Sequence, residues 1–306
     1  MITVVGSAVV DFTALLPHLP KLGETVMGFH PLKISAGGKG GNQAAAACKA
    51  GAKVNMVTKL GQDDFSKIIT AAYDEMGIHY DHIIFSKDVA TGTAPVLVDE
   101  NTGNNYVVVI PGGNLALTAA DIDTAEDLIA ASDVVILQLE ISPEANLRAA
   151  QLAHKHHVPV MLNPAPYSPM SDELVSLADY VTPNETEASY WSGVEVVDDE
   201  SAVKAAEIIK SKGAKNVIIT LGKRGSLISA DGETFFQDSF KVNAIDATGA
   251  GDAFNGGFAR AIEKGYNLRE AARFATAVSA LSVTKAGATP SMPLESEVME
   301  FLEKQN

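Results

Sequence analysis

The chain has 306 residues, of which 46% are hydrophobic and 20% charged, and its formal net charge at pH 7 is −15. That composition can bury a sizeable core and argues against a disordered chain. The negative charge would repel both a nucleic-acid backbone and an anionic membrane, so we expect neither as a partner.

The remaining composition indicates how the chain is organised and in which compartment it folds. Its single cysteine, Cys48, excludes an intrachain disulfide and suits a reducing compartment. Residues 1–6 carry no basic flank, and no later stretch reaches the ~18 apolar residues that a membrane span requires. We therefore expect a cytoplasmic protein made of one α/β domain with a small appendage, because two equal domains suit this length less well.

The beginning of the chain combines a buried strand with segments rich in glycine and proline. Residues 2–5 form a short β-branched run before Gly6, which predicts a buried parallel strand with Asp11 just past its end. Prolines and a glycine interrupt residues 12–34, so we expect irregular strands outside the main sheet there. Residues 37–43 place four glycines before an alanine-rich helix. A loop that approaches a ligand explains these glycines better than a loose linker does.

The middle of the chain predicts a small second sheet and then a long alternation of helices and strands. We expect a strand at 53–60, an amphipathic helix at 63–76, and a hairpin of strands 93–99 and 105–110 that could form a separate sheet with residues 12–34. From residue 117 the alternation indicates βαβ units and a parallel sheet, whose ligands gather at the carboxyl ends of its strands. The expected segments are helix 118–131, strand 134–139, helix 143–157, strand 158–162, helix 171–177, strand 180–182, helix 199–212, strand 217–221, a hairpin around Asp231-Gly232, and helices 268–283 and 295–305.

Polar side chains stand where several of these strands end. Glu140 follows strand 134–139 and projects from its carboxyl end. Asn184 and Glu187 follow strand 180–182 and share one face of the helix that begins there. A helix cap for Asn184 and solvent exposure for Glu187 are the structural alternatives. A further strand ends in a basic segment flanked by glycines, typical of a phosphate or nucleotide loop, formed by Thr220, Leu221, Gly222, Lys223, Arg224 and Gly225.

Residues 246–258 carry the most specific chemical pattern in the chain. Gly249 and Gly251, with Ala250 between them, allow a sharp turn, and the helix after this turn offers unpaired N–H groups that bind anions. Asp252 would repel a phosphate at that position, so we interpret it as the general base for a hydroxyl nucleophile, with a plain helix cap as the alternative. The spacing fits neither a Walker A loop nor a dinucleotide-binding turn.

These motifs resemble the ribokinase-like sugar kinases, the PfkB carbohydrate kinases, over nearly the whole chain. The resemblance rests on the signature Asp-Ala-Thr-Gly-Ala-Gly-Asp-Ala-Phe at 246–254 and on motifs that recur in the same order along the chain. Those are Gly6-Ser7 with Asp11, the glycine loop 37–43, Gln138-Leu139-Glu140, Asn163-Pro164-Ala165-Pro166, residues 182–187, and Thr220-Leu221-Gly222. The resemblance implies an α/β three-layer sandwich around a mostly parallel sheet, formed by residues 1–11, 35–90 and 111–306. It also implies a small, discontinuous β lid formed by residues 12–34 and 91–110.

The same resemblance implies a role for each residue singled out above. Asp252 would be the catalytic base, beside an anion hole formed by Gly249, Ala250 and Gly251. The sugar would contact Asp11, Gly38, Lys39, Asn42, Glu140 and Asp252. ATP would border Asn184, Gly251 and the segment Thr220 to Gly225, while Asn184 and Glu187 would organise Mg²⁺ through water. A monovalent cation, K⁺, would be held by Asp246, Thr248, Ser282, Lys285, Gly287 and Ser291, partly through their backbone carbonyls.

We therefore predict an ATP-dependent sugar kinase that transfers the γ-phosphoryl group to the primary hydroxyl of ribose and yields ribose 5-phosphate. Val9 stands where these kinases usually place an asparagine that faces the sugar, which leaves 2-deoxyribose, fructose or a nucleoside open as the acceptor. A degenerate member that binds sugar or nucleotide as a sensor is the alternative of another class, and an intact Asp252 argues against it. The resemblance also implies a homodimer joined through the β lid.

Overall fold

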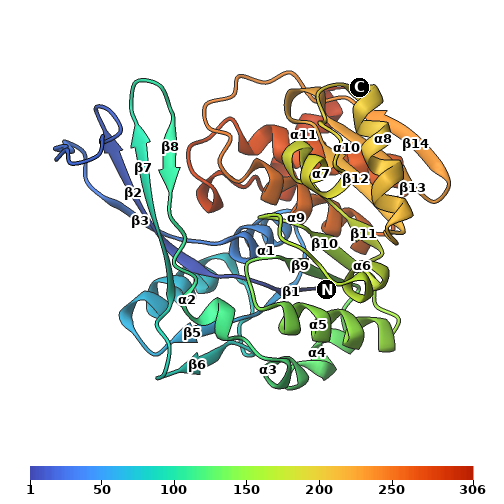
Figure 1. Ribbon diagram of the computed structural model, residues 1–306, viewed down its shortest axis with the longest axis horizontal. Coiled ribbons are helices and arrows are strands. Elements are labelled where there is room, and N and C mark those ends of the chain that lie inside the picture. Colours follow the sequence, from blue (N-terminus) through green and yellow to red (C-terminus); the bar gives the residue numbers. More distant parts are fainter. Residues whose placement is uncertain (306) are drawn as a thin grey trace.

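The computed structural model describes residues 1–305 and contains a main sheet of eight strands in the order β14-β13-β12-β11-β10-β9-β1-β4 (Figure 1). The strands β13 and β14 are antiparallel to their neighbours, and the other six are parallel. The strands are β1 (Ile2–Val5), β4 (Val54–Val57), β9 (Val134–Gln138), β10 (Val160–Asn163), β11 (Tyr180–Val181), β12 (Asn216–Thr220), β13 (Ser226–Ala230) and β14 (Glu233–Gln237).

Helices cover both faces of this sheet and make it the middle of three layers. Apolar side chains of β1 enter both layers, because Ile2 and Val4 pack into one buried cluster and Val5 into the other. One face carries α1 (Lys39–Lys49), α2 (Asp64–Met76), α9 (Ala250–Glu263), α10 (Leu268–Ser282) and α11 (Glu295–Lys304). The other carries α3 (Ala119–Asp123), α4 (Glu126–Ala130), α5 (Pro143–Lys155), α6 (Asp172–Leu177), α7 (Glu185–Ser192) and α8 (Asp199–Ser211). The expected α/β sandwich around a mostly parallel sheet is confirmed.

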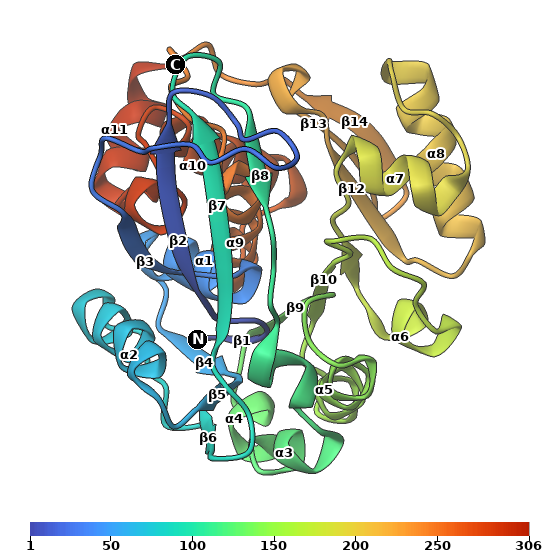
Figure 2. The same cartoon turned by 60° about the vertical axis from the view of Figure 1, so that its left-hand side comes forward.

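A second, mixed sheet stands beside this body, with its strands in the order β3-β2-β7-β8 (Figures 1 and 2). They are β2 (Val9–Leu16), β3 (Lys33–Gly37), β7 (Gly92–Asp99) and β8 (Asn105–Val107). β2 and β7 run parallel along their whole length, and β8 folds back on β7 as the expected hairpin. The sheet joins the two segments expected to form it, 12–34 and 91–110. Its strands extend beyond the first of these segments, because β2 begins at Val9 and β3 ends at Gly37.

Two expected elements are each divided in the structure. The helix expected at 118–131 is interrupted between α3 and α4, where the Thr124 hydroxyl donates to the Asp121 carbonyl at 2.7 Å and competes with the helical hydrogen bonds. The strand expected at 53–60 leaves the main sheet after β4. Its continuation, β5 (Lys59–Gly61), pairs with β6 (Ile84–Ser86) in a two-stranded sheet. Short 3₁₀ turns lie at η1 (Gly112–Ala116), η2 (Gly222–Arg224) and η3 (Thr289–Ser291).

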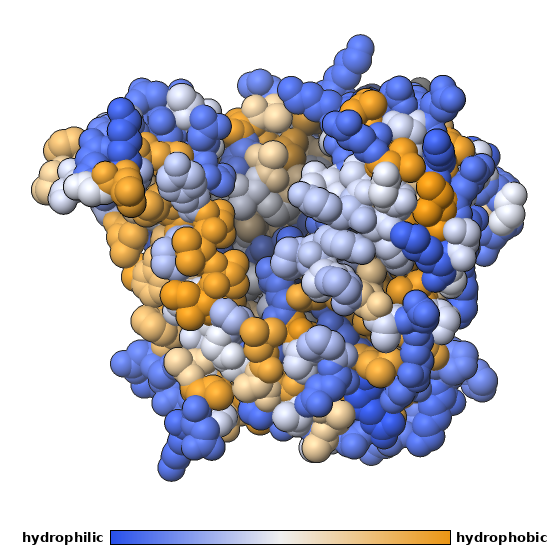
Figure 3. Space-filling model, viewed as in Figure 1, coloured by the Kyte–Doolittle hydropathy of each residue, from blue (hydrophilic) through white to orange (hydrophobic). Residues whose placement is uncertain are grey.

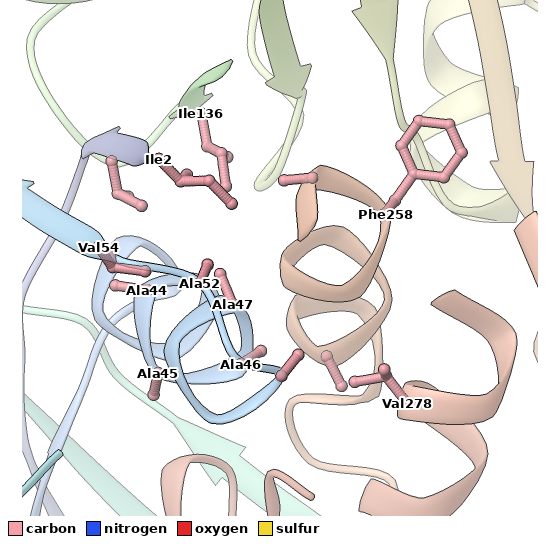
Figure 4. Packing of buried hydrophobic residues seen from close by; sticks show 14 of the residues in the cluster. Ile2, Ala44, Ala45, Ala46, Ala47, Ala52, Val54, Ile136, Phe258 and Val278 are labelled. Carbon is pink, nitrogen blue, oxygen red and sulfur yellow. The ribbon is translucent and has the colours of Figure 1, made fainter. Parts of the chain in front are cut away.

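The helices α1 and α9 pack unusually close together because small residues line their interface (Figure 4). Residues 40–47 of α1 are all buried, and six of these eight are glycine or alanine. A Cβ on Gly256 of α9 would lie 2.5 Å from the Cβ of Ala46, which leaves no room for a larger residue. The close approach brings the start of α1 beside the first turn of α9.

No helix within residues 1–305 combines the length and the apolar character that crossing a bilayer demands.

Candidate active site

Asp252 lies in the first turn of α9, buried against the start of α1. Its turn depends on Gly249, whose φ of 76° is in the left-handed region that favours glycine. The Asp252 carboxylate accepts hydrogen bonds from Asn42 Nδ2 at 3.1 Å and from Gln43 Nε2 at 3.0 Å. The N–H groups of Gly251 and Asp252 face no carbonyl of their own helix, because α9 begins there. A carboxylate and two unpaired N–H groups are therefore side by side at the start of α9.

The charges around Asp252 set how easily it takes up a proton. Burial raises the pKa of Asp252, while the Lys39 ammonium and the two amides favour the carboxylate, and the net direction is upward. Burial opposes the charge of Lys39, but the carboxylates of Asp252, Glu140 and Glu187 outweigh it and raise the Lys39 pKa. A carboxylate with a raised pKa that remains next to a cation suits a group that accepts a proton during a reaction.

Asp11 and Glu140 approach the same region from two different sheets. Glu140 follows β9 and accepts hydrogen bonds from Ser7 Oγ at 2.5 Å and from the Lys39 backbone N–H at 3.0 Å. Asp11 lies on β2 directly over Gly37, where a Cβ would sit 2.1 Å from a carboxylate oxygen of Asp11. Burial and the negative charges of Glu140 and Asp252 raise the pKa of Asp11 to about 6. The structure thus brings together Asp11, Lys39, Asn42, Glu140 and Asp252.

Val9 begins β2 and lies on the same face of that strand as Asp11, two residues away. It is 3% exposed, and its partners in register on the two neighbouring strands are Gly37 and Gly92. Gly38 stands at the start of α1 with a φ of 86°, and a Cβ there would meet the backbone of residues 7–9 at 3.1 Å. The loop before α1 therefore needs glycine at this position.

Asn184 and Glu187 form a reciprocal cap at the start of α7. Asn184 Oδ1 accepts from the Glu187 N–H at 2.9 Å, and Glu187 Oε2 accepts from the Asn184 N–H at 2.8 Å. The cap expected as the structural alternative for Asn184 is present, and Glu187 is 7% exposed rather than solvated. Burial raises the pKa of Glu187, although the hydrogen bond from the Asn184 N–H and the positive charge of Lys39 both favour the carboxylate form.

The segment from Thr220 to Gly225 lies next to this cap, since the Thr220 N–H donates to the Pro183 carbonyl at 3.0 Å. Leu221 is buried, and residues 222–224 form η2, whose backbone turns back at Gly225. The Arg224 guanidinium donates to Glu185 at 2.7 Å and to Asp199 at 2.8 Å. Arg224 is therefore anchored to α7 and α8 by its side chain, while Lys223 is exposed beside it.

Two of the residues expected around a monovalent cation, Thr248 and Gly287, contact a third, Asp246, beside the signature turn. Asp246 accepts hydrogen bonds from the Thr248 N–H and hydroxyl and from the Gly287 N–H, at 2.9, 2.6 and 2.8 Å. Burial raises the pKa of Asp246, but these bonds outweigh it and the net direction is downward. Ser282 and Ser291 are buried, and their hydroxyls donate to the backbone carbonyls of residues 279 and 288. The Lys285 ammonium pairs with Glu297 at 2.9 Å, so only its backbone could face an ion.

Metal-ligating side chains do not otherwise gather in the described part of the chain. Across residues 1–305, no group of three or more His, Cys, Asp and Glu side chains converges as a metal site.

Sequence reasoning missed three polar contacts of this site. Thr289 in η3 donates to Asn42 Oδ1 at 2.8 Å and so orients the Asn42 amide toward Asp252. Ser7 orients Glu140, and Gln43 contacts Asp252 directly. Asn42 and Gln43 are the only amides among the glycines and alanines of residues 40–47, which is a signal that could have drawn attention to Gln43.

Comparison with known proteins decides the family. The model of the pfkB family carbohydrate kinases matches residues 1–295. The chain belongs to the pfkB family of carbohydrate kinases. It is accordingly a phosphotransferase with an alcohol acceptor.

The relatives of this pfkB kinase match it over its full length. It is 43% identical over 302 residues to the ribokinase of Haemophilus influenzae, with 99% of this chain and 98% of that protein covered. It is 35% identical over 302 residues to a deoxyribokinase of Salmonella typhimurium, with 98% of each covered. The structure of Arabidopsis thaliana ribokinase complexed with ribose and ATP superposes with a TM-score of 0.92 at 33% identity, covering 99% of this chain and 98% of that one.

Proposed function

We propose that this pfkB kinase transfers the γ-phosphoryl group of ATP to the primary hydroxyl of ribose and that Asp252 is the general base. The observation that carries the proposal is the buried Asp252 carboxylate, held by Asn42 and Gln43 beside unpaired N–H groups of α9. Full-length similarity to ribokinases supports ribose as the acceptor.

The residues divide the work of the reaction between them. Asp11, Lys39, Asn42 and Glu140 hold the sugar, together with the backbone at Gly38, so that its hydroxyl points at Asp252. Asp252 takes the hydroxyl proton as the oxygen attacks the γ-phosphorus, and ADP leaves. The unpaired N–H groups of Gly251 and Asp252 stabilise the charge on the transferred group, whereas the Ala250 N–H already donates to the Ala247 carbonyl at 3.1 Å. Positioning and charge stabilisation are the main demands of phosphoryl transfer.

The nucleotide lies, in this proposal, along the segment from Thr220 to Gly225 with Asn184 and Gly251 at its phosphates. The Glu187 carboxylate is buried and close enough to Lys39 to raise the Lys39 pKa, and the oxygen that does not cap the Asn184 N–H fits a water-mediated Mg²⁺ position. Mg²⁺ there would neutralise phosphate charge. K⁺ fits the Asp246 carboxylate and the carbonyls near Lys285, Gly287 and Ser291, where it would fix the signature turn.

The second sheet is proposed as the lid of this site and as the surface that pairs two subunits. Figure 3 shows a cleft between this sheet and the helical body, with hydrophobic side chains gathered on the sheet side. Residues 106–110 are each about half exposed although all are large and apolar. Such a patch on a sheet edge is a surface that proteins usually cover, and a second copy of the chain would cover it.

One specific observation favours a second acceptor, 2-deoxyribose. Val9 presents an apolar side chain on the face of β2 that carries Asp11, so a sugar hydroxyl near it finds no partner there.

A coupled assay of ADP release over ribose, 2-deoxyribose, fructose and nucleosides tests the function. We expect turnover with ribose and 2-deoxyribose, and loss of kcat by about 10² to 10⁴ in Asp252→Asn with sugar and ATP binding kept within a few-fold. The N-cap of α9 is Gly249, so a mutant that retains a tenth of the wild-type kcat would leave Asp252 only a structural role, as the acceptor for Asn42 and Gln43. Wild-type protein that binds sugar without turnover would be a sensor.

A further inference from the structure

A line of buried amides leads to the Asp252 carboxylate from the interior of the protein. Gln43 Nε2 donates to Asp252 Oδ1 and to Asn163 Oδ1, both at 3.0 Å, and its Oε1 accepts from Gln138 Nε2 at 2.8 Å. Gln43 and Gln138 are 0% exposed and Asn163 is 5% exposed. Both N–H bonds and the carbonyl of Gln43 are therefore used, and water does not reach them.

This arrangement admits only one orientation of the Gln43 amide. If the amide flipped, its carbonyl oxygen would face the Asp252 carboxylate and the Asn163 carbonyl, and its nitrogen would face the nitrogen of Gln138. Each contact would then be repulsive or unpaired, which is costly in a buried site. Gln138 Oε1 lies against the backbone at Gly6, where a Cβ would be 2.0 Å from it, and it has no hydrogen-bond partner within residues 1–305.

Gln43 differs from Asn42 in what it can touch. Asn42 is 7% exposed and is among the residues proposed to hold the sugar, so its loss would disturb substrate binding as well as the base. Gln43 is fully enclosed between α1, α9 and the main sheet, so a bound sugar or nucleotide would not reach it. A role for Gln43 in the reaction would therefore act through Asp252 alone.

We infer that Gln43 is a positioning residue for the phosphoryl transfer, whose amide, oriented by Gln138, fixes the plane of the Asp252 carboxylate toward the acceptor hydroxyl. The inference rests on the proposed function of Asp252 as the base. The Gln43 hydrogen bond also favours the ionised carboxylate, and so opposes the effect of burial on the Asp252 pKa. Loss of the amide should leave the base misaligned and protonated to a higher pH.

The test compares Gln43→Met with the wild type in steady-state kinetics across pH. Methionine keeps the length and volume of glutamine and its helix propensity but donates no hydrogen bond. We expect kcat to fall by about tenfold to a hundredfold, with KM for sugar and for ATP changed less than about threefold. The acidic limb of the kcat profile should move to higher pH, because loss of the Gln43 hydrogen bond raises the pKa of Asp252.

A matched control separates this effect from general loss of core packing. Asn146 of α5 is 1% exposed and donates to the Gln138 backbone carbonyl at 2.7 Å, in contact with neither the base nor the substrate. Asn146→Leu should lower Tm about as much as Gln43→Met while leaving the acidic limb in place. Gln138→Met, which removes only the donor that orients Gln43, should give a smaller shift of the limb in the same direction.

A Gln43→Met protein that is folded and shows the wild-type acidic limb and kcat would overturn the inference. So would equal shifts of the limb in Gln43→Met and Asn146→Leu. If Gln43→Met does not fold, an unchanged acidic limb in Gln138→Met decides against it. Wild-type protein that phosphorylates no sugar would instead refute the proposed function. In that case ¹³C NMR of labelled aspartate in folded wild-type and Gln43→Met protein still tests the inference, because an unshifted Asp252 titration would overturn it.

Discussion

Replacing Val9 by asparagine tests whether one side chain sets the choice between ribose and 2-deoxyribose. Val9 is buried at the start of β2, on the face that carries Asp11, and both of its neighbours across the sheet are glycines. Neither glycine has a side chain of its own, but the Asp11 carboxylate lies against Gly37 and the Asn114 amide lies against Gly92. An asparagine placed here would direct its amide into the region that Asp11 and Asp252 share.

The structure sets the size of the expected effect. A sugar hydroxyl beside the Val9 isopropyl group loses water without gaining a partner, which costs about 1 to 3 kcal/mol when the loss is complete. That full cost is not expected here, because an apolar wall rejects an added hydroxyl only weakly. The wild type should therefore use ribose and 2-deoxyribose with little preference. A neutral hydrogen bond from asparagine adds about 0.5 to 1.5 kcal/mol, so Val9→Asn should raise the preference for ribose by about two- to twelvefold.

The measurement is kcat/KM for ribose and for 2-deoxyribose in the wild type, Val9→Asn and Val9→Ala. Alanine removes the methyl groups without adding a donor, so its ratio of the two sugars should stay near that of the wild type. An unchanged ratio in Val9→Asn would mean that water or the backbone already serves the hydroxyl and that Val9 does not read the sugar. If Val9→Asn and Val9→Ala change the ratio of kcat/KM for the two sugars equally, the volume of the side chain, rather than a hydrogen bond, sets the preference.

Three further predictions concern pH, the cation and assembly. Because the raised pKa of Asp11 is about 6, its carboxylate is lost as a sugar acceptor below that pH; KM for sugar should rise as pH falls through 6, and in Asp11→Asn that rise should be absent. If Asp246 and its neighbouring carbonyls hold K⁺, activity should be higher in K⁺ than in a bulky organic cation at matched ionic strength, and equal rates would remove the cation from the mechanism. The exposed apolar sheet should pair two chains, so light scattering at micromolar concentration should give a dimer that Val108→Lys dissociates; a wild-type mass near 32.1 kDa would refute the pairing.

Local sequence was enough to predict most elements and the groups around the reacting centre. The turn at Gly249, the helix start at Ala250 and the cap of Asn184 and Glu187 each depend on residues a few positions apart, whose backbone preferences act within one turn. Glu140 could be placed because the residues after the parallel strands of a sheet all emerge at the same edge. Local preference failed between 118 and 131, where a hydroxyl competes with the helix.

Only the tertiary structure decided which of these groups meet and in what orientation. Gln43 and Asp252 are 209 positions apart, and Thr289 and Asn42 are 247 apart. The contact between Gln43 and Asp252 depends on how closely α1 and α9 pack, which Gly256 permits, and no propensity along either helix encodes that distance. Packing also sets the partners of Arg224, because carboxylates on α7 and α8, those of Glu185 and Asp199, accept hydrogen bonds from its guanidinium. Local sequence thus determined which side chains lie at the edge of the sheet. Packing between distant segments determined the hydrogen-bond partners that orient these side chains and shift their pKa values.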